Sequence, residues 1–298
     1  MKKIITLLLL IPLSSFSQSK ISFTFDDGSL RDKPNHTLDQ WNSMLLQKLR
    51  DARVEAMFFV SGEGKTGYKG KQLLKSWNND GHKIANHTFN HLNYNNKTHT
   101  FEAFKDDFIK NDTIINTYSN YCKFFRFPYL KEGNTEEKIT AAKAFLKEQN
   151  YRNGYVTIDN SDWYIESRLV KRLKDNPNAD ISDFKTFYLN HIWERAQFYE
   201  KLSLKINGRH INHSLLLHHN LAAALFIDDL INMFISKGWK IVSASNAYKD
   251  PVYLTETKFS GESLIYALAK DSGKYDTILR ATGEDSKSIK IVMNKLGL

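Results

Sequence analysis

The stretch that decides the fold is SFTFDDGS, residues 22–29, where two adjacent aspartates follow a strand-like segment. Residues 22–25 alternate polar and apolar, which is typical of a β-strand. Neighbouring strand residues point to opposite faces, so Asp26 and Asp27 can share one site only where the strand breaks. We expect Gly28 to supply that break. A solvated turn is the simpler alternative for the same three residues.

The residues before this stretch have the pattern of a secretory signal peptide. Lys2 and Lys3 precede an apolar run from Ile4 to Leu13, and small residues follow it. This run is shorter than the roughly 20 residues that a membrane-spanning helix needs. We therefore predict a signal peptide over residues 1–17 and an exported protein, periplasmic or extracellular, without a membrane span.

The bulk composition is that of an ordinary globular protein. The 298 residues are 41% hydrophobic, and a single cysteine, Cys122, allows no internal disulfide. The formal net charge is +9, and removing Lys2 and Lys3 leaves 40 basic and 33 acidic residues, or +7. Because no basic block or nucleic-acid motif accompanies this charge, we interpret it as solubility charge and expect no nucleic-acid partner. We expect a monomer.

Strand-like and helix-like segments alternate along the chain. The apolar stretches typical of strands are 21–25, 56–60, 83–85, 124–127, 154–158, 214–217 and 240–242. Helical spacing marks residues 37–52, 69–80, 100–119, 136–149 and 220–237. This alternation predicts an α/β fold with a mostly parallel sheet or barrel, whose active site collects at the carboxyl ends of the strands.

Two regions lie outside this alternation. Residues 164–213 separate the fifth and sixth predicted strands, and their apolar spacing predicts a helical insert in the main domain, residues 18–250. The insert could roof a substrate groove or serve only as structural padding. Residues 251–298 form a charged tail that is also helical in pattern. The tail could pack across the bottom of a barrel.

Five groups of polar residues fall where predicted strands end. They are Asp26–Asp27, NHTFNH at 86–91, RFPY at 126–129, DNSDW at 159–163 and LLLHHN at 215–220. His87 and His91, four residues apart on a helical turn, would face the same way and suit one zinc ion. Two surface histidines are the alternative. With Asp27 as a third ligand the site would keep an open position, and Asp26 could act as a general base.

In this order and spacing, the five groups resemble the motifs of the NodB-homology polysaccharide deacetylases, carbohydrate esterase family 4. The resemblance covers about residues 21–250 and implies a distorted (β/α)7 barrel. It implies a secreted hydrolase of non-peptide carbon–nitrogen bonds that removes acetyl groups, N-acetyl in the first place, from a polysaccharide or oligosaccharide. The implied cofactor is a divalent metal, zinc first, with cobalt or nickel as alternatives.

The resemblance also implies catalytic roles for four residues. Asp26 matches the general base and His218 the general acid. Arg126 matches the residue that holds the base, and Asp162 the one that tunes the acid. We prefer His218 to His219 because the family pattern is apolar–Leu–x–His followed by a polar residue.

The remaining roles concern the metal and the substrate. Asp27, His87 and His91 match the metal ligands. The backbone N–H of Tyr129 matches an oxyanion donor, and Trp163 and Leu216 match the walls of the acetyl pocket. The chain departs from the family at Ser29, where proline is more common. A hydrolase of another linear or cyclic amide and a catalytically silent glycan-binding protein remain as alternative functions.

Overall fold

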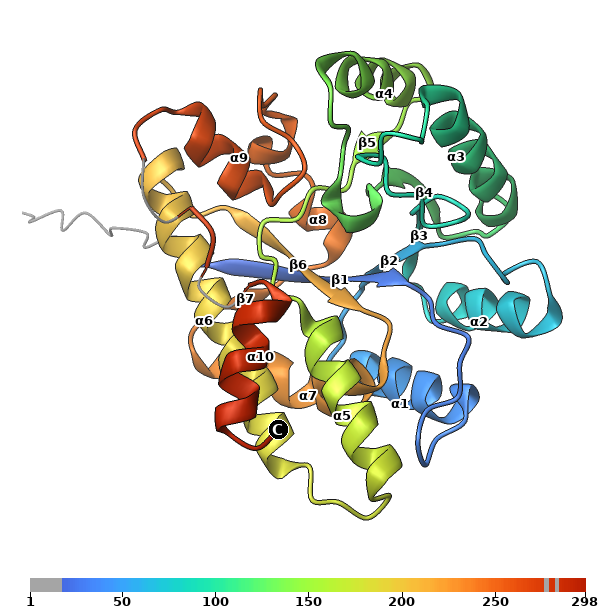
Figure 1. The fold of residues 1–298 in the computed structure, drawn as a ribbon, viewed down its shortest axis with the longest axis vertical. Coiled ribbons are helices and arrows are strands. Elements are labelled where there is room, and N and C mark those ends of the chain that lie inside the picture. The colour runs from blue at the N-terminus through green and yellow to red at the C-terminus, as the bar shows by residue number, and fades with distance from the viewer. Residues whose placement is uncertain (1–17, 276–278, 282–283) are drawn as a thin grey trace, which may run out of the picture.

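The computed structural model describes residues 18–275, 279–281 and 284–298 (Figure 1). The predicted signal peptide at residues 1–17 lies outside the described residues, as does Gly283 of the tail. Among the residues that are described, no helix is both long enough and apolar enough to cross a membrane.

A curled parallel sheet forms the centre of the molecule. Its strands are β1 (Lys20–Asp27), β2 (Met57–Val60), β3 (Lys83–Asn86), β4 (Tyr121–Phe125), β5 (Arg152–Asn153), β6 (Asn212–His218) and β7 (Lys240–Ile241). The order is β5-β4-β3-β2-β1-β6, and β7 also pairs with β1. All these pairings are parallel. The carboxyl ends of the strands therefore meet at one end of the sheet, as expected for this fold class.

Residues 152–158, which begin with β5, run from β4 to β6 and so connect the two sides of the sheet. Asn153 pairs with Phe125 of β4, and Ile158 forms a parallel bridge with Leu215 of β6. The expected (β/α) barrel is thus confirmed, in a distorted form in which this segment completes the curl. The predicted strand at 154–158 is only partly correct, because the segment crosses between two neighbours instead of running beside one. Gly154 permits the crossing, since an added Cβ would lie 2.3 Å from the Phe59 ring.

Helices surround the sheet (Figure 1). They are α1 (Leu38–Asp51), α2 (Tyr68–Asn79), α3 (Phe101–Ile115), α4 (Glu136–Glu148), α5 (Asp162–Asp175), α6 (Ser182–Asn207), α7 (Leu221–Ser236), α8 (Ala244–Ala247), α9 (Leu264–Asp271) and α10 (Ser286–Lys295), with 3-10 turns η1 (Pro128–Leu130) and η2 (Pro251–Leu254). The predicted helices match α1, α2, α3, α4 and α7 closely. At the starts of α1, α3 and α7, the side chains of Thr37, Thr100 and Asn220 accept backbone N–H groups of the first turn as caps.

The insert consists of α5 and α6 and supports the site from outside. The ring of His191, on α6, bonds through Nε2 to the carbonyl oxygen of Asn160 at 2.7 Å. α6 also packs on α7 and α9. No described residue of α6 lines the cavity at the strand ends. Residues 164–213 thus contribute no side chain to the cavity lining, so of the two roles considered, a roof or structural padding, the arrangement favours the structural one.

The tail reaches both ends of the barrel. At the lower end, the Tyr253 hydroxyl donates to the Asn212 carbonyl at the start of β6 (2.7 Å). Beyond η2 the tail crosses residues 152–158, where the Leu264 N–H donates to the Val156 carbonyl (2.7 Å). Glu262 and Arg280 then lie at the upper end, beside the carboxyl ends of the strands. The expectation that the tail packs across the bottom of the barrel therefore describes only its first part, around η2.

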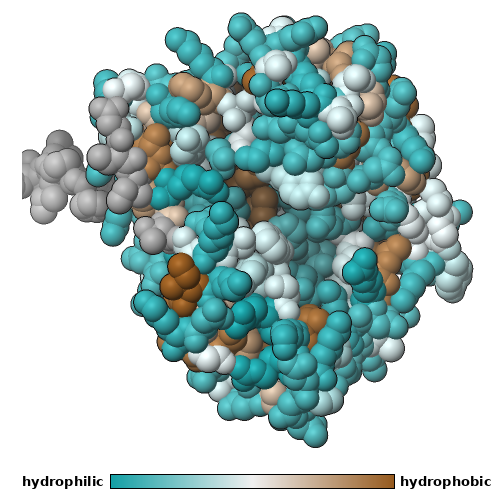
Figure 2. Space-filling view, in the orientation of Figure 1, coloured by the Kyte–Doolittle hydropathy of each residue, from teal (hydrophilic) through white to brown (hydrophobic). Residues whose placement is uncertain are grey.

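Apolar side chains are concentrated inside the molecule. Phe25, Phe58 and Trp77 stack in sequence, with ring centroids 5.1 and 4.1 Å apart. Figure 2 shows that hydrophilic side chains cover most of one face, with small separate hydrophobic patches between them. The described part of the chain thus has a well-packed interior on which the polar site at the strand ends is built.

Candidate active site

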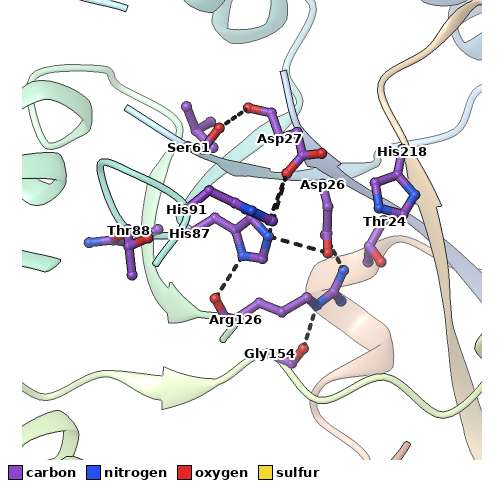
Figure 3. A network of polar contacts seen from close by, with 12 residues as sticks. Thr24, Asp26, Asp27, Ser61, His87, Thr88, His91, Arg126, Gly154 and His218 are labelled. Carbon is purple, nitrogen blue, oxygen red and sulfur yellow. Dashed lines mark hydrogen bonds and ion pairs between the residues drawn. The ribbon is translucent and has the colours of Figure 1, made fainter. Parts of the chain in front are cut away.

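The backbone breaks at Asp27, the last residue of β1. Asp27 has φ 77° and Gly28 has φ 85°, so both adopt the left-handed conformation. An added Cβ at Gly28 would lie 2.8 Å from the Trp77 ring, which explains the glycine. The Ser61 N–H and hydroxyl both donate to the Asp27 carbonyl at 3.1 Å (Figure 3). The break therefore begins one residue earlier than predicted and brings both carboxylates to one site.

Asp27, His87 and His91 form a compact cluster (Figure 3). Their potential ligand atoms all lie within 4.8 Å of one another. The Asp27 Oδ1 atom is 3.2 Å from His91 Nε2 and 3.7 Å from His87 Nε2. The two ring centroids are 5.0 Å apart. The structure therefore brings together the three residues that were predicted to bind a metal.

The histidines are not on the helical turn that was predicted. Thr88 and His91 have φ of 59° and 54°, and the segment is an irregular loop. Asp107 of α3 holds this loop, because both of its carboxylate oxygens accept from the Asn90 N–H at 3.1 Å. Its backbone carbonyl accepts from the Phe89 N–H at the same distance. Tertiary contacts thus override the local helical spacing.

The chemistry of the cluster fits a divalent cation. His87 Nδ1 lies 2.7 Å from the Arg126 carbonyl, which can only accept, so Nδ1 carries the proton and Nε2 offers its lone pair to the cluster. The Asp27 Oδ1 atom is buried and has no hydrogen-bond partner among the described residues. A buried carboxylate oxygen without a partner is costly unless a cation or proton occupies the site.

Electrostatics favour the ligand forms of these groups. Burial raises the pKa of Asp27, but the nearby His218, His91 and His87 outweigh it and lower the pKa below its usual value. Burial, helped by the charge of His87, lowers the pKa of His91 to about 4. At neutral pH the cluster therefore offers a carboxylate and a neutral imidazole, which are the forms that bind metals.

Asp26 is held by Arg126 beneath the cluster. Its Oδ1 lies 2.5 Å from Arg126 Nη1, and its Oδ2 lies 3.7 Å from His87 Nε2. Arg126 is 1% exposed and also donates from Nε to the Gly154 carbonyl (2.8 Å) and from Nη2 to the Tyr248 hydroxyl (3.0 Å). Its guanidinium lies 3.9 Å from the Phe59 ring centroid. One carboxylate oxygen is thus fixed, while the other faces the cluster.

His218 and Asp162 form a second pair across the site. His218 Nδ1 lies 2.6 Å from Asp162 Oδ1, and the His218 N–H donates to Oδ2 at 3.0 Å. The Asn220 side chain donates to the same Oδ2 at 3.0 Å. Burial lowers the pKa of His218, but the fully buried Asp162 carboxylate outweighs it and raises the pKa to about 10. His218 is therefore protonated at neutral pH and able to donate.

His219, the residue after β6, points away from the site. It is 2% exposed and lies between Trp41 and Trp77, with ring centroids 4.2 and 4.9 Å away. Its Nε2 lies 3.0 Å from the Asn42 side-chain oxygen. The structure therefore places His218 in the site and gives His219 a role in core packing.

These groups line one cavity of about 470 Å³ at the carboxyl ends of the strands. Tyr129 and Trp163 are 59% and 45% exposed at its edge, and Leu216 is 5% exposed in its wall. Tyr129 has φ 58°, and its ring centroid lies 4.5 Å from that of His91. All three residues predicted to contact substrate therefore belong to the cavity.

The sequence analysis missed several residues of the site. Tyr248 bonds to the buried arginine. Lys131, Glu262 and Arg280 line the cavity, and the last two come from the tail. Lys131 lies two residues after RFPY, so its proximity could have been noticed. The tail residues carry no motif that connects them to the barrel, so only the folded chain reveals them.

Comparison with known proteins is consistent with this geometry. The family model for polysaccharide deacetylase matches residues 14–147, which include the first three motif groups. A peptidoglycan-N-acetylglucosamine deacetylase of Bacillus cereus is 29% identical over 149 residues, which are 50% of this chain and 48% of the relative. The aligned region thus spans about half the length of that relative.

Solved structures share the fold. A peptidoglycan N-acetylglucosamine deacetylase in complex with 4-naphthalen-1-yl-N-oxidanyl-benzamide aligns with a TM-score of 0.53 and 21% identity, covering 78% of this chain and 90% of the other. A mutant of a family 4 carbohydrate esterase pseudoenzyme of Bacillus anthracis, with restored enzymatic activity, aligns with a TM-score of 0.54 and 18% identity, covering 78% and 68%. The sequence and structure matches agree: residues 14–147 match the polysaccharide deacetylase family, and the chain shares the fold of the solved family 4 carbohydrate esterases.

Proposed function

We propose that this protein is a metal-dependent deacetylase that releases acetate from an acetylated glycan, with N-acetyl groups as the first target. The observation that carries the proposal is the convergence of three groups on one cavity. These groups are the Asp26–Arg126 pair, the cluster of Asp27, His87 and His91, and the His218–Asp162 pair. A pseudoenzyme that had lost its chemistry would be expected to lack one of them.

The proposed metal site consists of Asp27, His87 and His91. A divalent ion bound there would supply Lewis-acid polarisation of the acetyl carbonyl. Two imidazoles and one carboxylate suit zinc, and also cobalt or nickel. The unpartnered Asp27 Oδ1 and the fixed tautomer of His87 support this assignment.

The chain's own residues supply the proton transfers. Asp26 is positioned to take a proton from the attacking water, because Arg126 holds one of its oxygens and leaves the other facing the cluster. A new C–O bond forms between the water oxygen and the acetyl carbon, and the carbonyl electrons move onto the carbonyl oxygen as an oxyanion. The C–N bond then breaks as the carbonyl re-forms, and His218 gives its proton to the departing amine. The products are acetate and the free amino sugar.

Other residues orient the acetyl group. The backbone N–H of Tyr129 is proposed to donate to the developing oxyanion, with the residue held in its left-handed conformation. Leu216 and Trp163 would contact the methyl group from the cavity wall. Asp162 positions His218 and keeps it charged before the amine leaves.

The relatives suggest which glycan to test first. The curated relative and one aligned structure are named as peptidoglycan N-acetylglucosamine deacetylases. We propose an acetylated cell-wall glycan or a related oligosaccharide as substrate. Export by a signal peptide at residues 1–17 would bring the enzyme to such a polymer.

The test is acetate release by residues 18–298 from chito-oligosaccharides, peptidoglycan and acetyl-xylan. Each substrate is tested with metal-free protein, with added zinc or cobalt, and with Asp26→Asn. We expect metal-dependent release that Asp26→Asn abolishes. No release together with one bound metal per chain, and turnover of a cyclic imide, would favour another amide hydrolase. Tight glycan binding without turnover would favour a silent binding protein.

A further inference from the structure

We propose that the C-terminal tail supplies a sugar-binding subsite beside the catalytic residues, formed by Glu262 and Arg280. In this subsite the two side chains hydrogen-bond to the hydroxyls of a neutral sugar unit adjacent to the unit that is deacetylated. The inference rests on the proposed function and makes it more specific. It names residues outside the five motif groups as determinants of substrate length.

The first part of the subsite is anchored on the loop after β4. Lys131 Nζ donates to the Gly261 carbonyl and to Glu262 Oε1, each at 3.1 Å. An added Cβ at Gly261 would lie 3.3 Å from the Leu130 carbonyl, so the tail approaches this loop closely. The same loop carries Tyr129. Glu262, whose side chain is 22% exposed, is therefore fixed at the cavity wall beside the proposed oxyanion donor.

The second part is anchored on the loop that precedes α5. Arg280 Nε donates to Glu284 Oε1 at 3.1 Å, and the Glu284 carbonyl accepts from the Ser161 hydroxyl at 2.5 Å. The Tyr199 hydroxyl of α6 holds the other Glu284 oxygen. Ser161 directly precedes Asp162. Arg280 is thus positioned on the side of the cavity next to the proposed acid.

The contacts of Lys131 with Glu262 and of Glu284 with Arg280 bring Glu262 and Arg280 together as an ion pair in the cavity wall. Arg280 Nη2 lies 3.6 Å from Glu262 Oε2, and both side chains line the same cavity as the catalytic groups. Neither residue contacts the Asp26 or His218 pairs through any described hydrogen bond or ion pair. They are therefore placed to touch the part of the substrate that does not react.

The charges around Arg280 favour a neutral ligand. The Arg280 guanidinium already pairs with Glu262 at 3.6 Å and with Glu284 at 3.1 Å, and Asp159 lines the same cavity. An acidic substituent would add another carboxylate to this group. A sugar hydroxyl can instead donate to Glu262 and accept from Arg280 at once. The exposed rings of Tyr129 and Trp163 on the same cavity offer apolar faces that can cover a sugar ring.

The experiment compares N-acetylglucosamine oligomers of increasing length in the acetate-release assay. We expect Arg280→Lys and Glu262→Gln to raise KM for the longest oligomer about tenfold, the loss expected for hydrogen bonds to charged groups. We expect kcat to change less than about twofold. The shortest substrate that is turned over should be affected least. Lys290→Ala, an exposed change on α10 outside the cavity lining, is the control and should match the wild type.

Three results would overturn the proposal. Unchanged KM at every length in both folded variants would remove the subsite. A fall in kcat at constant KM would make the two residues positioning residues instead. A KM that changes only for carboxylate-bearing fragments, and that rises steeply with salt, would show that the ligand is anionic.

Failure of the proposed function would be recognised separately. If the wild type releases no acetate from any substrate, the same oligomers are titrated calorimetrically against wild type and both variants. Binding that weakens in Arg280→Lys and Glu262→Gln, but not in Lys290→Ala, would support the subsite without the reaction. Equal binding, or none, would overturn it.

Discussion

Asp26 on β1 and His218 on β6 are register partners on adjacent parallel strands. Their pairing is the last of seven that run from Lys20 and Asn212. Because parallel strands end together, this register alone brings the proposed base and the proposed acid to the same end of the barrel. Arg126 and Asp162 then hold the two side chains from separate loops.

The effects of replacing Asp26 and Arg126 on the free energy of unfolding should depend strongly on each other. Both side chains are nearly fully buried, and removing one partner of a buried ion pair costs about 3–5 kcal/mol. We expect Arg126→Met to destabilise the protein by this amount and Asp26→Asn plus Arg126→Met to cost less than the sum of the single changes. Urea unfolding of the four proteins measures the coupling. Additive effects would contradict it.

Asp26→Asn should also lower kcat by about 10²–10⁴-fold, the usual contribution of a general base. Asp39→Asn, an exposed change at the start of α1, is the matched control. Circular dichroism should show that both variants are folded. Residual activity of Asp26→Asn within tenfold of the wild type would exclude the base role.

Asp162→Asn should change the pH dependence of catalysis. The Asp162 carboxylate raises the pKa of His218 to about 10, so the protonated acid persists through neutral pH. Without this carboxylate, burial lowers the pKa against only the weaker effects of Asp27 and Asp26. The alkaline limb of the kcat profile should therefore move to lower pH. A variant with lower kcat but an unmoved limb would show that Asp162 has only a structural role.

Metal binding should stabilise the folded protein. A ligand at 100 times its Kd adds about 2.7 kcal/mol to the free energy of unfolding, so added zinc should raise the Tm of metal-free protein by several degrees. His91→Ala should lose most of this rise, because it removes one member of the cluster. His36→Ala, outside the cluster, should keep it. Equal shifts in all three proteins would point to binding elsewhere.

Glu132 should make stability depend on pH. Burial raises its pKa from 4.5 to about 7, so the folded state keeps a proton that the unfolded chain has already lost. The free energy of unfolding should therefore fall as pH rises from 4.5 to 7, by about 1.4 kcal/mol per pKa unit. Glu132→Gln should reduce this loss, whereas Glu137→Gln, exposed on α4, should not. Urea unfolding at pH 5 and pH 8 measures the difference.

Local patterns predicted much of this molecule. The strand at residues 21–25, the helical spacing of five segments and the five polar groups depend on neighbours in sequence, and the structure has the strand, the helices and the groups at the strand ends. The prediction started strand β4 at residue 124, whereas the strand begins at Tyr121. Tyr121 and Cys122 are only half-buried and do not alternate clearly, so the local pattern misses them. The crossing at 152–158 was predicted as an ordinary strand for another reason. Its two partners, β4 and β6, are far apart in the chain, so no local pattern reveals that the segment crosses between them.

The parts that sequence analysis missed depend on tertiary contacts. The left-handed Thr88 and His91 follow from Asp107 on α3, which no local spacing at 87–91 reveals. The positions of Glu262 and Arg280 follow from Lys131 and Glu284, contacts that form only in the folded chain. The cluster of Asp27, His87 and His91 was predictable, because the strands of a parallel sheet end at the same edge.

The tail has a further consequence for the order of events during synthesis. Glu262 and Arg280 follow every other residue of the cavity wall in the chain. The chain is synthesised from its amino terminus, at about 5–20 residues per second. All seven strands are therefore synthesised before the wall beside Tyr129 and Ser161 exists. The barrel can assemble around its catalytic groups while the cavity is still open on one side, and the last segment to dock completes the surface that meets the substrate.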